Sequence, residues 1–166
     1  NKIIAQITNH ISTLLQGSYS CICIIQHYGM VIFKDKQGIR PLILGINKNN
    51  DYLISSESIS LTSLDYDIVT DIYNETLIFK NNESEYETFK YSLQSFSPCI
   101  FEWIYLARDE SILYNVPVYL TRMKIGTLLA KRIKKEIDIN DINKIDYVIP
   151  IPKTSKPAAL AISNEL

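Results

Sequence analysis

The hydrophobic pattern of this chain changes its period close to Pro98, and the change predicts two structural units of different class. Up to about residue 96, short apolar runs alternate with turn residues, as is typical of antiparallel strands. From Val118 onward, apolar residues recur with the spacing of an amphipathic helix. We therefore expect an α+β unit over residues 1–96, and over residues 97–166 a linking segment followed by the beginning of an α/β unit.

The first unit is expected to begin with a helix over Ile3–Leu15, whose apolar residues form one stripe. Four strand-like runs then predict two strand pairs in an antiparallel meander: Tyr19–Ile25 with Met30–Phe33, and Ile39–Leu44 with Tyr52–Ser55. Ile68–Ile72 and Thr76–Phe79 are also strand-like. Asp35–Gly38 is a turn signal with Gly38 available for a positive φ. Ile59–Leu64 predicts a short helix with a preceding hydroxyl as its N-cap. Glu83–Phe96 indicates an edge hairpin and a connection.

The second unit is expected to contain a long helix from Val118 and a strand–turn–helix element near its end. The buried side of the long helix should be its apolar stripe, which consists of Met123, Ile125, Leu128, Leu129 and Ile133. The basic cluster from Lys131 to Lys135 is interpreted as a solvated surface. Tyr147–Ile149 predicts a short buried strand, and Pro157–Leu166 predicts a helix with proline in its first turn. This succession is typical of the opening of a parallel sheet.

The turn between that strand and that helix is the best candidate for a ligand site. In open α/β sheets, phosphates bind beyond the carboxyl end of a strand and at the N-terminus of the following helix. Thr154 and Ser155 contribute hydroxyl groups here, and Lys153 contributes a positive charge. The glycines of a Walker-type loop are absent from this turn. A helix start that is merely capped by a hydroxyl explains the same residues, so the pattern alone leaves both interpretations open.

Charge and cysteine content limit the partners and the compartment. The chain carries 17 basic and 18 acidic side chains, a net charge of -1, so we expect no affinity for nucleic acid or for anionic membranes. The longest apolar run, around Cys21–Ile25, is far shorter than a membrane span, and no signal peptide is visible. Three cysteines, an odd number, indicate free thiols in a reducing compartment and predict a cytoplasmic protein. Because the chain begins with Asn1, we expect it to be part of a longer protein.

Several motifs, in the same order along the chain, resemble the amidophosphoribosyltransferases, also called glutamine phosphoribosylpyrophosphate amidotransferases. Residues 17–21 read GSYSC, residues 35–42 read DKQGIRPL and residues 56–58 read SES. Residues 98–108 read PCIFEWIYLAR and make the match specific, since other glutaminases share the DxxGIRPL turn. Val118–Arg122 with the following Gly126, and the strand and turn over 146–155, complete the resemblance.

The resemblance implies a fold for each unit. Residues 1–96 would be the C-terminal part of an N-terminal-nucleophile glutaminase, a type 2 glutamine amidotransferase domain in which antiparallel sheets lie between helices. Residues 97–166 would link to, and begin, a type I phosphoribosyltransferase domain with a parallel sheet.

The resemblance also implies a reaction. Members form 5-phosphoribosylamine, pyrophosphate and glutamate from phosphoribosyl pyrophosphate, glutamine and water, in the first committed step of purine biosynthesis. Their nucleophilic cysteine is the first residue of the mature protein and would lie upstream of this chain, so no catalytic residue is expected within it. We expect this segment alone to be inactive, and the complete protein to be a homo-oligomer.

Four positions can be matched to the binding residues of the family. Lys153, Thr154 and Ser155 correspond to the pyrophosphate loop, and Thr154 to a hydroxyl that contacts Mg²⁺. Lys153 stands where the family usually has an acidic residue. Cys99 corresponds to a ligand of a 4Fe-4S cluster in some members. Because other members keep this cysteine without a cluster, we expect an inert thiol at Cys99.

Two other readings stay open. The chain could derive from a decayed or non-catalytic paralogue that acts as a binding or structural subunit, or from another glutamine amidotransferase. One departure from the family pattern bears on this choice: the usual Arg-Pro-Asp is Arg108-Asp109-Glu110 here. An intact nucleophile upstream and the paired aspartates of the ribose-phosphate loop downstream would identify the enzyme.

Overall fold

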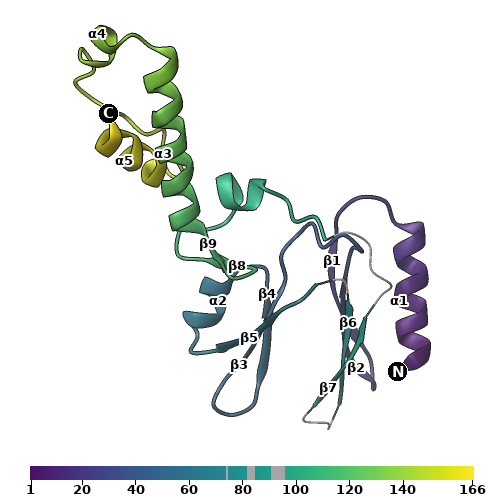
Figure 1. Ribbon diagram of the computed structural model, residues 1–166. Coiled ribbons are helices and arrows are strands. Elements are labelled where there is room, and N and C mark those ends of the chain that lie inside the picture. The colour runs from purple at the N-terminus through teal and green to yellow at the C-terminus, as the bar shows by residue number, and fades with distance from the viewer. Residues whose placement is uncertain (74, 82–84, 91–95) are drawn as a thin grey trace. The chain divides into compact units, whose positions relative to one another are not determined.

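The computed structural model describes residues 1–73, 75–81, 85–90 and 96–166 (Figure 1). They form two compact units, Asn1–Cys99 and Ile100–Leu166, so the chain passes from one unit to the other beside Pro98. Among the residues that the structure describes, none of the helices combines the length and the apolar content that crossing a membrane requires.

Two antiparallel sheets build the first unit (Figure 1). The four-stranded sheet has the order β1-β2-β6-β7 and contains Ser20–Ile25, Gly29–Lys34, Glu75–Lys80 and Tyr86–Lys90. The three-stranded sheet has the order β4-β3-β5, in which β3 is Ile43–Ile46, β4 is Tyr52–Ser55 and β5 is Asp67–Asp71. The expected pairs β1–β2 and β3–β4 are confirmed. Their continuation as one meander is wrong, because β2 pairs with β6 and not with β3. The chain leaves the first sheet after β2 and returns to it only at β6.

The turn at Asp35–Gly38 explains why β2 and β3 lie in different sheets. The buried Asp35 carboxylate accepts hydrogen bonds from the backbone N–H groups of Gln37 and Ile39, at 3.0 and 3.1 Å. Gly38 has a φ of 64°, which confirms the turn. Pro41 then follows without a backbone donor, and β3 begins only at Ile43 instead of at Ile39.

The core of this unit lies between the two sheets. Ile32 and Leu77 of the first sheet pack with Leu44 of the second, together with Leu42 and Ile72. On the opposite face of β2, Val31 and Phe33 face Ile4 and Ile11 of helix α1 (Lys2–Leu14), which confirms the first predicted helix.

Helix α2 (Ser58–Thr62) covers the outer face of the second sheet. Its buried Leu61 lies close to Gly45, whose neighbour Leu44 points into the core between the sheets. The unit thus stacks helix, sheet, sheet and helix. The predicted hydroxyl N-cap of α2 is wrong, because Glu57 occupies that position without a capping side-chain bond and Ser58 is already helical. Residues 82–84 and 91–95 of the expected edge hairpin lie outside the described residues, whereas β7 does form the edge next to β6.

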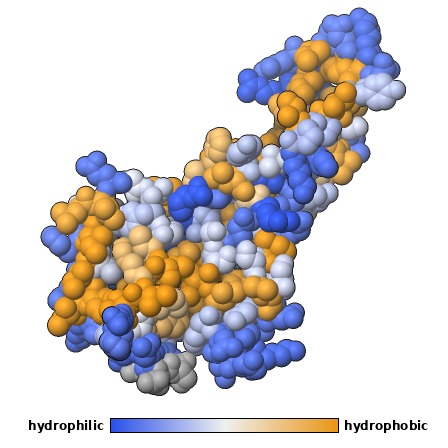
Figure 2. All heavy atoms as spheres, turned by 180° about the vertical axis from the view of Figure 1, so that it is seen from behind, coloured by the Kyte–Doolittle hydropathy of each residue, from blue (hydrophilic) through white to orange (hydrophobic). Residues whose placement is uncertain are grey.

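The surface of the first unit carries apolar side chains along β1 and α1. Ile22 and Ile24 are exposed on the edge strand, and Ile3, Ile7 and Leu14 are exposed on the helix. Figure 2 shows apolar residues gathered in continuous patches on the visible face of the molecule. Apolar patches of this kind are typical of surfaces that pack against further protein.

A buried hydrogen bond between Thr8 and Thr76 fixes α1 to the four-stranded sheet. Their hydroxyl oxygens are 2.8 Å apart, and both side chains are buried. Thr8→Val and Thr76→Val are each expected to lower the free energy of unfolding by about 1 kcal/mol, since each leaves the other hydroxyl without this partner. The double variant should lose less than the sum of the two. Urea unfolding of all four proteins tests this; strictly additive losses would contradict the coupling.

Helices dominate the second unit. The π-helix η1 (Glu102–Leu106) leads into the short hairpin of β8 (Ile112–Leu113) and β9 (Val116–Pro117). Three helices follow: α3 (Val118–Glu136), α4 (Ile139–Ile142) and α5 (Lys156–Glu165). α3 and α5 pack side by side (Figure 1). The helices predicted from Val118 and from Pro157 are confirmed, and the basic cluster of α3 is exposed as predicted.

The buried side of α3 differs from the predicted one. The residues of α3 that are buried share an i, i+4 spacing: Val118, Arg122, Gly126 and Ala130. The side chain of Leu128, in contrast, is 57% exposed. Small residues form the contact because α5 approaches closely: a Cβ added to Gly126 would lie 2.3 Å from the backbone oxygen of Ala158.

The predicted buried strand over Tyr147–Ile149 is wrong. This segment has no strand partner, and the side chains of Tyr147, Ile149 and Ile151 are 83%, 83% and 85% exposed. A parallel strand is stable only beside other strands. Within the described residues of this unit, β8 and β9 are the only strands, and they pair with each other.

Candidate functional site: a pocket beside the 152–155 turn

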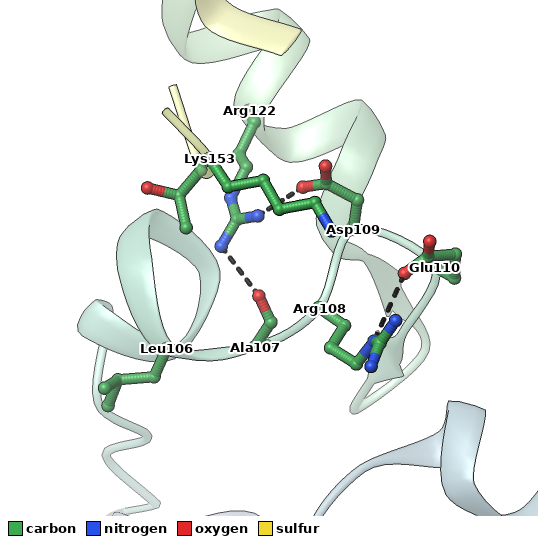
Figure 3. A pocket seen from close by; sticks show the side chains of 8 residues that line it. Leu106, Ala107, Arg108, Asp109, Glu110, Arg122 and Lys153 are labelled. Atoms are coloured by element: carbon green, nitrogen blue, oxygen red, sulfur yellow. Dashed lines mark hydrogen bonds and ion pairs between the residues drawn. The ribbon is translucent and has the colours of Figure 1, made fainter. Parts of the chain in front are cut away.

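The second unit contains a pocket of about 260 Å³ next to the turn that sequence analysis selected (Figure 3). Three segments contribute to it: the loop after η1, helix α3 and the turn before α5. Its lining residues are Leu106, Ala107, Arg108, Asp109, Glu110, Arg122, Lys153 and Thr154. Ligand pockets for whole small molecules usually measure about 300–1,000 Å³, so this volume suits one polar group of a larger ligand.

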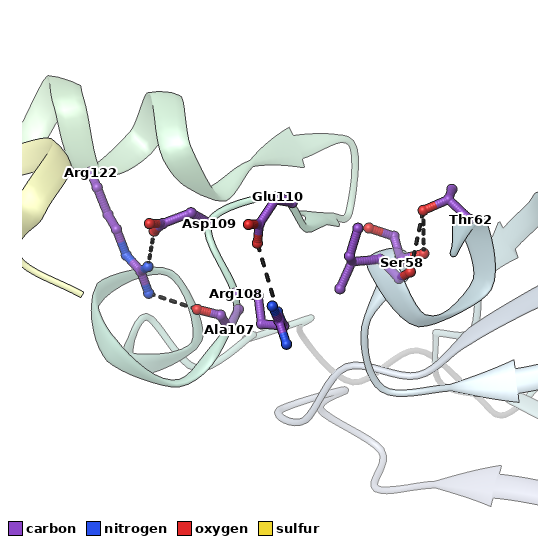
Figure 4. A network of polar contacts seen from close by, with 8 residues as sticks. Ser58, Thr62, Ala107, Arg108, Asp109, Glu110 and Arg122 are labelled. Carbon is purple, nitrogen blue, oxygen red and sulfur yellow. Dashed lines mark hydrogen bonds and ion pairs between the residues drawn. The ribbon is translucent and has the colours of Figure 1, made fainter. Parts of the chain in front are cut away.

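Arg122 fixes the wall of the pocket that lies opposite the turn. Its side chain is 3% exposed, and its guanidinium donates to the carbonyl oxygens of Trp103 at 2.7 Å and Ala107 at 2.9 Å. It also forms an ion pair with Asp109 (Figures 3 and 4). Because Arg can satisfy several acceptors in one plane, this single side chain holds the end of η1 and the loop after it against α3. Arg122 is therefore a structural cation whose guanidinium is held by three protein acceptors.

The turn before α5 is held by its own backbone and by Ser155. The Ser155 hydroxyl donates to the carbonyl oxygen of Ile151, and the Ser155 carbonyl accepts from the N–H of Ala159 at 2.9 Å. The peptide bond between Pro152 and Lys153 is cis. Lys153 and Thr154 line the pocket, whereas Ser155 does not. The structure thus brings Lys153 and Thr154 together with the Arg122 wall and assigns Ser155 to the turn itself.

The ionisable side chains that line the pocket are three basic and two acidic. Asp109 pairs with Arg122, and Arg108 pairs with Glu110 at 3.7 Å. The remaining cation is Lys153, whose side chain extends across the pocket toward the loop that carries Asp109 (Figure 3). Helix α5 begins directly after the turn and adds the partial positive charge of a helix N-terminus. The pocket is consequently suited to an anion.

Sequence reasoning identified the turn but missed the wall of the pocket. The pairing of Arg108 with Glu110 was not predicted. Arg122 belongs to a matched motif, but its burial was not predicted, because arginine is rarely buried. An arginine that is spaced by four from Val118 and Gly126 was the available signal.

Cys99 lies in the first unit, away from any cluster of metal ligands. It is half-buried as a free thiol, and its N–H donates to the carbonyl oxygen of Ile39 at 3.0 Å. In the described ranges, no group of three or more His, Cys, Asp or Glu side chains is arranged to hold a metal ion. The inert thiol expected at Cys99 therefore stays a prediction.

Comparisons with solved structures define the fold. The chain superimposes on the Bacillus subtilis glutamine phosphoribosylpyrophosphate amidotransferase, solved with ADP and GMP, with a TM-score of 0.76, 21% identity and coverage of 96% of this chain and 33% of that one. A second solved structure, described as the allosteric regulatory enzyme of purine biosynthesis, gives a TM-score of 0.77 at 21% identity and similar coverage. The fold is that of part of these amidotransferases. None of the protein-family models matches the chain.

Curated sequences make the relationship specific. The amidophosphoribosyltransferase of Escherichia coli is 39% identical over 158 residues, which cover 92% of this chain and 31% of the relative. Those of Pasteurella multocida and Saccharomyces cerevisiae are 38% and 35% identical with the same coverage. The resemblance seen in the motifs is confirmed: this chain is homologous to a part of the amidophosphoribosyltransferases and spans about a third of their length.

Proposed function

We propose that this chain functions as part of an amidophosphoribosyltransferase. The enzyme would form 5-phosphoribosylamine, pyrophosphate and glutamate from phosphoribosyl pyrophosphate, glutamine and water. The observation that carries the proposal is the identity of 39% to the Escherichia coli enzyme along 92% of this chain. The position of Lys153 and Thr154 in an anion-suited pocket gives independent support.

In this proposal the two units belong to different catalytic domains. Residues 1–96 form the later part of an N-terminal-nucleophile glutaminase domain, which is supported by two antiparallel sheets stacked between helices. Residues 97–166 link to and begin a type I phosphoribosyltransferase domain. The exposed apolar segment over Tyr147–Ile151 supports this part, because a neighbouring strand would bury it.

The reaction divides between the two domains. A cysteine thiolate upstream of this chain would attack the carbonyl carbon of the glutamine amide, and the C–N bond breaks to release ammonia as the thioester forms. Water then hydrolyses the thioester to glutamate and the free thiol. The nitrogen of ammonia then attacks C1 of the ribose, and the bond from C1 to the pyrophosphate oxygen breaks with its electrons on the leaving group. Lys153 would neutralise the leaving pyrophosphate, and the turn held by Ser155 would position Thr154 at its oxygens.

The residues of the pocket fit a magnesium–pyrophosphate better than a free magnesium ion. Mg²⁺ prefers oxygen ligands and usually binds through carboxylates together with substrate phosphates. The two carboxylates of the pocket are already paired with arginines, and Lys153 adds a positive charge. Thr154 is thus the one side chain of this turn that we propose to hold Mg²⁺, which would withdraw charge from the phosphate oxygens. An inert thiol at Cys99, a homo-oligomer and a cytoplasmic location stay predictions.

The proposal is tested with the protein encoded by the complete reading frame. We expect pyrophosphate release that depends on glutamine and phosphoribosyl pyrophosphate, and none from the 166-residue segment alone. Thr154→Val should slow pyrophosphate release roughly ten- to hundredfold because it removes an oxygen that contacts the leaving group, while hydrolysis of glutamine continues. Thr154→Ser keeps the hydroxyl and serves as the control. A complete protein that folds but neither hydrolyses glutamine nor releases pyrophosphate would instead identify a non-catalytic paralogue.

A further inference from the structure

The pocket carries one more positive than negative side chain, and the excess charge resides on Lys153. Arg122 is committed to Asp109 and two carbonyl oxygens, and Arg108 lies beside Glu110. Among the lining residues, Lys153 is therefore the cation that no carboxylate of the pocket neutralises. Its side chain is exposed at the pocket and is directed across it (Figure 3).

A lysine at this position can supply part of the positive charge that a metal ion would bring to phosphate oxygens. An acidic side chain in the turn would attract a divalent cation, whereas the ammonium group of Lys153 repels a free cation and attracts phosphate oxygens directly. The α5 N-terminus reinforces the same preference. Both Lys153 and Mg²⁺ neutralise the same anionic oxygens, so the presence of one reduces the need for the other.

We propose that Lys153 allows this pocket to bind the diphosphate group of its substrate without Mg²⁺. The inference rests on the proposed function, since it takes the pocket to be the site of the diphosphate. It adds that the position of Lys153 sets the metal dependence of binding in this protein. Lys153 is a specificity-determining residue, and the ligand class is a diphosphate ester or inorganic pyrophosphate in its metal-free form.

The test measures binding of inorganic pyrophosphate to the protein of the complete reading frame by isothermal titration calorimetry, once with EDTA and once with excess Mg²⁺. We expect wild type to bind pyrophosphate in EDTA with a Kd within about tenfold of its Kd in Mg²⁺. The hydrogen bond from the charged Lys153 to a phosphate oxygen should change the Kd by roughly tenfold at an exposed site and so replace most of the contribution of the metal. Lys153→Glu should lose binding in EDTA by more than about tenfold and regain it when Mg²⁺ is added.

Two further variants keep the result interpretable. Lys153→Met removes the charge without adding a negative one and should fall between wild type and Lys153→Glu in EDTA. Lys131→Met removes the same charge from the exposed side of α3, outside the pocket, and should bind as wild type does. Circular dichroism of each variant confirms that the fold is kept.

The outcomes separate this inference from the proposed function. If wild type binds pyrophosphate only in Mg²⁺ and Lys153→Met binds equally well there, the metal-free inference is overturned and the pocket remains a diphosphate site. If wild type binds pyrophosphate under neither condition, the assignment of the pocket fails as well. Rescue of Lys153→Glu by Mg²⁺ together with its loss in EDTA would establish the role of Lys153.

Discussion

Replacing Arg122 by Met is expected to lower the free energy of unfolding of the Ile100–Leu166 unit by about 3–5 kcal/mol, the cost of breaking a buried ion pair on one side. The substitution keeps the apolar stem of the side chain but removes every donor. The carbonyl oxygens of Trp103 and Ala107 and the carboxylate of Asp109 then lose their partner. Hydrogen exchange of the α3 amides should accelerate by roughly two to four orders of magnitude.

A second arginine of the same helix provides the matched control. Arg132 pairs with Glu136 at 2.9 Å, but its side chain is solvent-exposed. Arg132→Met should therefore change the free energy of unfolding by less than about 1 kcal/mol. Arg122→Lys retains the charge and cannot reach three acceptors in one plane, so we expect an intermediate loss. Equal protection of the α3 amides against hydrogen exchange in wild type and in Arg122→Met would refute the structural role of Arg122.

Gly126→Ala is expected to destabilise the same unit, although alanine is the better helix former. Helix propensity alone predicts a gain of about 1 kcal/mol. The added Cβ would lie 2.3 Å from the oxygen and 2.8 Å from the Cα of Ala158, and neither backbone atom can rotate away. We therefore expect a net loss of about 1–3 kcal/mol from overpacking, and a larger one for Gly126→Val.

The consequence of Gly126→Ala extends to the pocket. When α5 moves away from α3, the turn at the beginning of α5 moves with it, so pyrophosphate binding should weaken together with stability. Leu128→Ala is the control on the exposed side of α3, and it should cost less than about 0.5 kcal/mol. Thermal unfolding of wild type, Gly126→Ala and Leu128→Ala measures these differences in stability. A more stable Gly126→Ala variant would contradict the close packing of α3 on α5.

Local signals in the sequence were sufficient where the structure is local. The hairpin of β1 and β2 and the turn at Asp35–Gly38 were predicted because turn residues and short apolar runs specify them. The pairing of β2 with β6 was not, because partners that are far apart in the chain leave no mark in one sequence. The layering of the first unit follows from that long-range pairing.

The second unit shows where periodicity misleads. Leu128 was predicted to be buried, but it is exposed. The close contact of α3 with α5 favours the smallest side chains, which a hydrophobic periodicity does not detect. Arg122 was not expected inside, since arginine is rarely buried unless its donors are satisfied. The segment Tyr147–Ile149 has the apolar residues of a buried strand but forms none, because it has no neighbouring strand to pair with. Lys153 and Thr154 were selected because a turn with hydroxyl groups before a helix is typical of phosphate sites, and both line a pocket. Their binding role stays a prediction.

The most direct test of the account is the intact mass and N-terminal residue of the native protein, with its reading frame followed through both ends. In the Pasteurella multocida relative, 156 aligned residues amount to 31% of the length, so a complete enzyme should contain about 500 residues. We predict a mature protein of that size that begins with cysteine and continues past Leu166 into paired aspartates. A native product that ends near Leu166 and carries no N-terminal cysteine would contradict the assignment as an amidophosphoribosyltransferase.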